Sequence, residues 1–408
     1  MEQANSGQLT PIKRPDYNNL MEKRIRSILM ICTNYDKYSL EEDGQIEFQI
    51  YREYVDLNIS NPPKFTWVDT TAHAEELLRK ERAFDLVICM YNTADEGIFK
   101  LSRTLKGNGI NVPVILLTNF SKEVFKRIDK EDKSCVDYIF SWNGNADLIL
   151  AIIKLIEDNM NAEKDIFRSG VQCILLVEDS IRYYSTYLPA IYKLVLQQSA
   201  EFLKEALNEQ QQKFRKRARP KILLATNYQD AVMLYEKYKS NMLGIISDIG
   251  FVMHKNDPSE SENLEAGLEL TRIIRQDNPY MPVLLQSSQE SMKEKAMELG
   301  CGFILKYSMT LLMELSEYIS EEFVFGDFIF RDLHTGEILG RAKDLKSMQI
   351  LLNEMPQEVF MYNASRNRFS KWLFSRGLFS LGRDFRNMEI GKFDSFQKMR
   401  EYMIKKFD

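Results

Sequence analysis

The sequence lacks the side chains on which many zinc and redox sites are built. Its 408 residues include only three histidines, and these are far apart: His73, His254 and His334. This scattering leaves little material for a zinc site or a histidine-based catalytic triad. The five cysteines are also scattered, and no CxxC motif occurs among them. We therefore expect buried cytosolic thiols rather than a metal knuckle or a redox motif.

Long apolar runs and a strong charge of either sign are missing as well. No run reaches the roughly 20 apolar residues that a membrane helix needs, so no membrane span is expected. The net charge of −5 argues against a dominant nucleic-acid surface. Residues 1–23 lack the apolar core of a signal peptide, and we expect them to form a disordered leader on a cytoplasmic protein.

Short apolar segments alternate with helical patterns through the first 322 residues. They predict an α/β fold with two parallel sheets, one in residues 24–160 and one in residues 171–322, joined by a polar linker at 161–170. The second unit repeats the pattern of the first. The expected strands are 27–32, 64–68, 85–90, 113–118 and 136–140, and then 171–177, 221–225, 243–248, 282–287 and 302–306.

Residues 323–408 predict a small, mainly helical α+β module. A hairpin is expected around Leu333 to Gly336, followed by helices at 342–353, 357–374 and 395–407. The segment from Tyr362 to Trp372 is rich in polar and aromatic residues and can be a docking surface. We favour the alternative that Phe369, Trp372 and Leu373 form the module's own core.

One helix of the second unit is expected to be unusually long. No strong helix breaker occurs between Pro189 and about Arg217, so residues 180–217 predict a helix of roughly 50 Å. Its distal half would pack on another domain or on a second copy of the chain as a homodimer. The basic run from Lys213 to Arg219 is read as a solvated helix end, with nucleic-acid binding as the alternative.

Adjacent carboxylates follow the first strand of the second unit. Glu178 and Asp179 come directly after a buried apolar run, and Asp248 ends a strand expected to lie beside it. Like charges in a half-buried crevice need a cation, and a hard divalent metal is the simplest candidate. The alternative is that Asp179 or Ser180 merely caps the next helix.

Two further polar residues end strands at the same edge of this sheet, Ser287 and Lys306. Together these groups suit the acceptance of a phosphoryl group. Mg²⁺ would be held by the three acids and by the backbone carbonyl of Gly250. Asp248 would attack phosphorus as an aspartate nucleophile, while Lys306 and Ser287 would contact the phosphoryl oxygens.

These five positions resemble the site of response-regulator receiver domains. Phe303, three residues before Lys306, matches the aromatic switch position of that family. The resemblance implies a flavodoxin-like fold and a bacterial two-component phosphorelay, in which a histidine kinase or phosphotransfer protein phosphorylates Asp248. Ser287 and Phe303 would then act as switch residues. Tyr307 stands where the family usually has proline, and the loop at 248–267 is expanded.

The first unit resembles a receiver that has lost its site. Cys32 and Thr33 replace the acidic pair, Met90 replaces the acceptor, and Ser141 replaces the lysine, whereas Thr118 is retained. Such a pseudo-receiver would serve for contact. A redox pair of Cys32 with Cys89 is an alternative to two small buried hydrophobic residues.

The whole arrangement is similar to the N-terminal regulatory part of bacterial phosphoenolpyruvate synthase or pyruvate phosphate dikinase-like proteins. The catalytic portion of such an enzyme is absent from this sequence, which has no Gly-rich phosphate loop. We therefore expect a regulator without enzyme activity beyond its own phosphorylation and dephosphorylation. The alternatives are a phosphorylation-independent scaffold and a metal-dependent phosphatase, although Asp248 lacks the second acid of an Asp-x-Asp motif.

Overall fold

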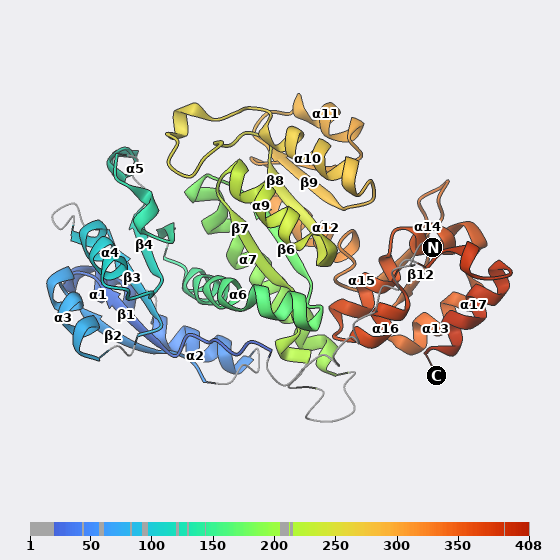
Figure 1. Ribbon diagram of the computed structural model, residues 1–408, viewed down its shortest axis with the longest axis horizontal. Helices are drawn as coiled ribbons and strands as arrows, with labels where there is room; N and C mark the ends of the chain where they lie inside the picture. The colour runs from blue at the N-terminus through green and yellow to red at the C-terminus, as the bar shows by residue number, and fades with distance from the viewer. Residues whose placement is uncertain are drawn as a thin grey trace, which may run out of the picture.

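The computed structural model contains two α/β domains and a mainly helical C-terminal module, which follow one another along the chain. The second α/β domain lies between the other two parts (Figure 1). The structure describes residues 20–42, 45–56, 61–81, 84–91, 97–119, 122–128, 130–142, 144–204, 212, 215–386 and 388–407.

Each α/β domain is built on a five-stranded parallel sheet. In both sheets the strands lie in the order second, first, third, fourth, fifth, which is the flavodoxin-like arrangement. The first sheet contains β1 (Ser27–Ile31), β2 (Lys64–Val68), β3 (Leu86–Met90), β4 (Val114–Asn119) and β5 (Tyr138–Trp142). The second contains β6 (Cys173–Val177), β7 (Lys221–Ala225), β8 (Met242–Asp248), β9 (Val283–Ser287) and β10 (Gly302–Leu305). The predicted fold class is therefore confirmed.

Helices cover both faces of each sheet. The first domain has α1 (Asn34–Glu42), α2 (Ile46–Asp56), α3 (Thr71–Glu81), α4 (Gly97–Gly107), α5 (Lys122–Ile128) and α6 (Asp147–Ser169). The second has α7 (Ile181–Leu203), α9 (Tyr228–Tyr238), α10 (Ala266–Asp277), α11 (Met292–Glu298) and α12 (Leu311–Glu321). Strands β3, β6, β7 and β8 are buried along their whole length, as apolar strands between two helical layers should be. The five cysteines are buried thiols, as expected.

The two α/β domains share one hydrophobic core. A single cluster of buried residues runs from Met30 in the first sheet, through Ile152 of α6 and Leu188 of α7, to Leu176 in the second sheet. Helices α6 and α7 therefore form a common layer between the sheets (Figure 1). The two domains therefore pack against each other through a continuous apolar interface.

Each of the facing sheet edges is closed by side chains of the other domain. At the edge strand β5, the backbone N–H of Ser141 donates to Ser185 Oγ at 2.9 Å, and the Tyr184 hydroxyl donates to the carbonyl of Ile139. At the edge strand β7, the backbone N–H of Ile222 donates to Asp158 Oδ2 at 3.0 Å. Exposed strand edges invite pairing with other chains, and this exchange removes that opportunity at both edges.

A buried network of charged groups joins α6 to the second domain. The carboxylate of Asp158 is fully buried and lies 2.8 Å from both terminal nitrogens of Arg219. It also accepts from the Tyr192 hydroxyl at 2.9 Å. The ammonium of Lys221, equally buried, lies 2.8 Å from Asp165. Arg219 was expected on a solvated helix end, but its guanidinium is needed to compensate the buried acid.

The segment predicted as a linker is helical. Helix α6 continues through residues 161–169 and ends at Ser169. Gly170 follows it as the C-cap, and its left-handed conformation (φ 81°) is typical of that position. The polar character that suggested a linker comes from side chains used internally: Asp165 is fully buried and accepts from the backbone N–H of Met21 at 3.2 Å. Residues 20–23 of the predicted leader are therefore ordered, and residues 1–19 lie outside the described ranges.

The predicted helix over 180–217 is too long. Helix α7 ends at Leu203, which makes it about 35 Å long at 1.5 Å per residue. The side chain of Arg215 donates to the carbonyl of Phe202 at 2.8 Å, so the chain has already turned back. Residues 205–211 and 213–214 lie outside the described ranges. The apolar face of α7 is covered by α6, β5 and α12 of the same chain.

The C-terminal module has its own core. It consists of the hairpin β11 (Phe328–Arg331) and β12 (Ile338–Ala342), followed by α13 (Leu345–Glu354), α14 (Gln357–Ser365), α15 (Arg368–Ser375), α16 (Phe379–Asp384) and α17 (Phe396–Lys405). Phe369, Trp372 and Leu373 lie in this core, as favoured from the sequence. The single helix expected at 357–374 is divided at Asn367, which is left-handed (φ 55°), and α16 was missed.

We predict that Asp158→Asn destabilises the two α/β domains by about 3–5 kcal/mol, because it leaves the buried cations Arg219 and Lys221 without full compensation. Urea denaturation would measure the loss. The matched control is Glu163→Gln on the same helix, since Glu163 also pairs across the interface, with Lys237 at 2.8 Å, but in an exposed position. A control variant as unstable as the Asp158 variant would contradict the role of burial.

Candidate functional site

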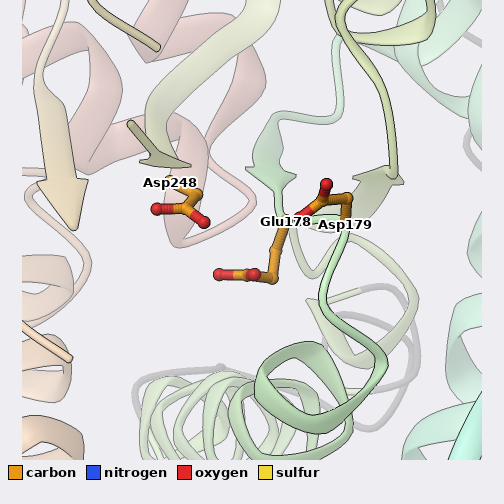
Figure 2. A group of neighbouring side chains, drawn as sticks. All are labelled: Glu178, Asp179 and Asp248. Carbon is orange, nitrogen blue, oxygen red and sulfur yellow. The ribbon is translucent and has the colours of Figure 1, made fainter. Parts of the chain in front are cut away.

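Three carboxylates meet at the carboxyl edge of the second sheet. Glu178 and Asp179 follow β6, and Asp248 ends β8, which pairs directly with β6. One oxygen from each of them can be chosen so that all three lie within 4.8 Å of one another. Figure 2 shows the three side chains gathered around the ends of the two strands. The convergence predicted from the sequence is therefore present.

Lys306 reaches the same place from the end of β10. Its ammonium lies 2.5 Å from Asp248 Oδ2 and 2.7 Å from Glu178 Oε2, and its side chain is only 5% exposed. Burial alone would lower the pKa of Lys306, but the two carboxylates raise it above its usual value. The lysine is therefore a fixed cation, and it compensates one of the negative charges.

The remaining negative charge is poorly compensated. Burial, followed by the charge of Asp248, raises the pKa of Glu178 well above its usual value, and burial also raises the pKa of Asp248. For Asp179, burial and then the charges of Glu262 and Asp248 raise the pKa to about 7. A group of acids that resists ionisation in this way is suited to a hard cation with oxygen ligands.

Two buried oxygen atoms beside the site lack well-directed hydrogen bonds to any described residue: Glu178 Oε2 and the hydroxyl of Tyr187. The Glu178 atom is ion-paired with Lys306, but the geometry is not that of a hydrogen bond. Three carboxylates, one of which has an incompletely satisfied oxygen, fit the ligand set that Mg²⁺ prefers.

Backbone groups hold the acids in place. The N–H of Ile249 donates to Asp248 Oδ1 at 2.7 Å, and the N–H of Val252 donates to Asp179 Oδ2 at 3.1 Å. Ser180 occupies the N-cap position of α7, but its hydroxyl makes no capping bond to a described residue. Asp179 bonds to the loop after β8 and not to α7, so capping of that helix does not explain Asp179. Glu178 Oε1 accepts from the backbone N–H of Ser180 at 3.1 Å, which holds the second acid at the start of α7.

The other predicted site residues lie at or near this edge. Ser287 ends β9, is buried, and accepts at its carbonyl from the backbone N–H of Lys306 at 2.9 Å. Gly250 follows β8, and its N–H contributes a hydrogen bond that lowers the pKa of Asp248 against the larger effect of burial. Phe303, on β10, is half-buried and packs against the core of the second domain.

Sequence reasoning missed three residues around the site. The ring of Tyr183 lies with its centroid 4.2 Å from Lys306 Nζ, so it contributes a cation–π contact. Tyr187, one turn later on α7, has a pKa raised first by burial and then by the charge of Glu178. Tyr183 and Tyr187 are four residues apart, which places both on one face of a helix, and this spacing could have identified them from the sequence. Glu262 approaches from the expanded loop, and its position could not be inferred from the sequence.

The corresponding edge of the first sheet carries no such cluster. Among the described residues, Glu178, Asp179 and Asp248 form the only group of three potential metal ligands. Cys32 and Met90 stand at the equivalent strand ends as buried, mostly apolar side chains.

A cleft of about 420 Å³ connects the candidate site with the first domain. One wall is formed by residues 136–139 of the first domain, and the other by residues 179–184 and by the expanded loop around Glu262. Asp179 lies on this cleft. The candidate site therefore faces the first α/β domain. In a domain that stood alone, the same edge of the sheet would face solvent.

Comparison with known proteins finds only remote structural similarities. No family model and no curated protein matches the sequence. Two solved structures titled as two-component response regulator/GGDEF domain proteins are 11% and 12% identical, each with a TM-score of 0.28; the matches cover 72% of this chain and 98% and 96% of theirs. GanP, a glucose-galactose binding protein from Geobacillus stearothermophilus, is 9% identical with a TM-score of 0.20, covering 79% and 99%.

Because these TM-scores are low, the similarities carry no argument about function. The fold assignment rests on the strand order of the two sheets. In the part of the chain that the structure describes, no helix is both long and apolar enough to span a membrane.

We predict that Asp179→Asn stabilises the protein without added metal at pH 8, by about 2 kcal/mol. With a folded-state pKa of about 7, above its unfolded value, Asp179 favours folding only while it is protonated, and this contribution is lost as the pH rises through 7. The gain from the substitution should therefore shrink between pH 8 and pH 5.

Urea denaturation at the two pH values measures this effect. The control is Asp277→Asn, because hydrogen bonds from Lys239 and Tyr235 lower the pKa of Asp277. That variant should lose stability at pH 8. If Asp179→Asn were also destabilising at pH 8, the claim that burial raises the pKa of Asp179 and makes its ionised form unfavourable would be refuted.

Proposed function

We propose that the second α/β domain is a receiver that accepts a phosphoryl group on Asp248 in a Mg²⁺-dependent reaction. The observation that carries the proposal is the placement of Lys306 against Asp248 and Glu178, beside a third carboxylate, at the carboxyl edge of the sheet. Lys306 is buried and paired with Asp248, the last residue of β8. Its ammonium can therefore move from the carboxylate of Asp248 to an oxygen of an incoming phosphoryl group.

The proposed metal ligands are Glu178, Asp179, Asp248 and the backbone carbonyl of Gly250. When bound, Mg²⁺ would neutralise the acids and the phosphoryl oxygens, which allows an anionic nucleophile to approach an anionic donor. The raised pKa values of the acids support this assignment, because they report negative charge that the cations among the described residues leave uncompensated.

The transfer itself would use the side chains already in place. A carboxylate oxygen of Asp248 forms a bond to phosphorus, while the bond between phosphorus and the donor breaks and the donor leaves with the electron pair. Lys306 Nζ then pairs with a phosphoryl oxygen instead of Asp248 Oδ2, and the Ser287 hydroxyl donates to another phosphoryl oxygen. The product is an acyl phosphate on Asp248.

Phosphorylation would act as a switch through Ser287 and Phe303. A dianionic group on Asp248 attracts the hydroxyl of Ser287 and its loop, and the half-buried ring of Phe303 lies on the neighbouring strand. The proposed donor is a histidine kinase or a phosphotransfer protein. The pseudo-receiver would bind and position the receiver, a role supported by the shared core and the exchanged edge contacts.

A phosphorylation-independent scaffold is the second candidate. It is favoured by the extent to which the two α/β domains are fused, since fusion limits the movement that a switch needs. A place in the regulatory part of a phosphoenolpyruvate synthase-like protein stays a hypothesis drawn from the sequence resemblance alone.

We predict that the chain incubated with Mg²⁺ and a small acyl-phosphate donor gains one hydroxylamine-labile phosphoryl group, and that Asp248→Asn gains none. Intact-mass spectrometry measures both. The control is Asp257→Asn in the expanded loop, which should label like the unaltered chain, because Asp257 instead accepts from the backbone of His254 at 2.8 Å. Labelling of the Asp248 variant, or of neither protein, would favour the scaffold.

We also predict that Mg²⁺ binds about tenfold more weakly at pH 6 than at pH 8. With its pKa at about 7, Asp179 must lose a proton before it can act as a ligand. Isothermal titration calorimetry at the two pH values measures the ratio. Asp257→Asn should keep the same pH dependence, whereas equal affinity at both pH values would exclude Asp179 as a ligand.

A further inference from the structure

A separate cavity lies at the opposite end of the second sheet, between the receiver and the C-terminal module. Its volume is about 230 Å³. It adjoins the starts of the strands, because Pro282 and Gly300, which precede β9 and β10, are part of its lining. The carboxylate site lies at the opposite, carboxyl edge of the same sheet, at the ends of β6 and β8. The two sites are thus distinct.

The lining of this cavity is strongly basic. Four cationic side chains face a single carboxylate among the described lining residues. The cations are Arg275 from the receiver and Arg366, Arg368 and Lys371 from the module, and the acid is Glu322. Such an excess of positive charge at a seam between two parts of the chain calls for an explanation, because like charges gathered in a cavity repel one another.

Two of the four cations have structural roles. The guanidinium of Arg275 donates to the carbonyls of Leu299, Met281 and Gly300, at 2.8, 2.5 and 2.9 Å. Arg368 pairs with Glu322 at 3.2 Å and donates to a backbone carbonyl, although its buried Nε has no hydrogen-bond partner among the described residues. The acid of the cavity is therefore already engaged.

The other two cations are available for a ligand. The guanidinium of Arg366 lies 3.6 Å from the ring centroid of Tyr362 and 4.4 Å from that of Tyr280, and its Nη1 donates to the carbonyl of Tyr362 at 3.3 Å. Contacts from both the module and the receiver therefore fix its orientation. The ammonium of Lys371 donates to the carbonyl of Leu243 at 3.1 Å. No carboxylate within the described residues forms an ion pair with either group.

Lys371 is held in an environment that opposes its charge. Burial, and then the charges of Arg368 and Arg386, lower its pKa to about 7. The remaining charged groups of the cavity are Arg275, Arg366 and the engaged Glu322. An anion in the cavity would reverse this effect and keep Lys371 protonated.

We propose that this cavity binds a small ligand that carries a dianionic phosphate group, with Arg366 and Lys371 as its principal contacts. A pre-oriented guanidinium can bind two phosphate oxygens at once, and a lysine supplies a point charge beside it. The volume is below that of pockets for drug-sized molecules, which leaves room for a phosphate and a few further atoms. A bound ligand would contact the receiver and the module together, and would stabilise their junction.

The proposal is tested by isothermal titration calorimetry of the full chain with inorganic phosphate at pH 8, in EDTA and at constant ionic strength. EDTA keeps metal out of the carboxylate site. We expect saturable binding of one phosphate per chain and proton uptake by Lys371, visible as an enthalpy that changes with the ionisation enthalpy of the buffer. Arg366→Gln, in a partly exposed position that tolerates replacement, should weaken binding at least about tenfold.

Two controls separate this site from others. Lys346→Gln removes an exposed lysine of the same module, and Asp257→Asn alters the loop beside the carboxylate site. Both should bind phosphate as the unaltered chain does, and EDTA makes the result independent of the proposed Mg²⁺-dependent phosphorylation. Absence of saturation, or equal weakening by Arg366→Gln and Lys346→Gln, would overturn the proposal. So would saturable binding of a phosphoserine peptide where inorganic phosphate fails, because it would assign the cavity to a protein partner.

Discussion

The buried carboxylate of Asp158 is the constraint on which the arrangement of the two α/β domains depends. A carboxylate in the interior is tolerated only when cations and hydrogen-bond donors surround it, and here they come from the second domain: Arg219, Tyr192 and the backbone of Ile222. Separation of the domains would leave this acid and its cations without partners. The interface is therefore specified by charge as well as by the shared apolar core.

At the candidate site the buried acids also need compensating cations, but there the compensation is incomplete. Around Asp158 and Asp165 the buried acids are matched by Arg219 and Lys221. At the carboxyl edge, Lys306 is the one cation of the described residues that forms ion pairs within the group of three acids. In the cavity between the second α/β domain and the C-terminal module, positive side chains outnumber negative ones. Matched charges hold the fold together, and unmatched charges mark places where an ion or a charged ligand can add stability.

Much of the architecture could be predicted because its signals are local. Apolar runs fixed the ten strands of the two sheets, and polar residues at the ends of those runs identified Asp248, Ser287 and Lys306. The failures came where a polar residue is used inside the protein. Asp165 is one of the polar residues for which the end of α6 was predicted to be a linker, but its side chain is buried. Arg219 was predicted to lie on a solvated helix end, but it forms a buried ion pair with Asp158. Composition alone cannot tell a polar group that faces water from one that faces a partner.

The closure of strand β7 by Asp158 has a consequence for how the second α/β domain can be studied in isolation. A fragment that begins at Val171 would retain the whole candidate site but lose α6. Its outer strand would then present the N–H of Ile222 to solvent, and Lys221 would face the gap without its acids. Such a fragment would tend to self-associate along that strand, so dimerisation observed with it would report the loss of α6 and not a property of the intact protein.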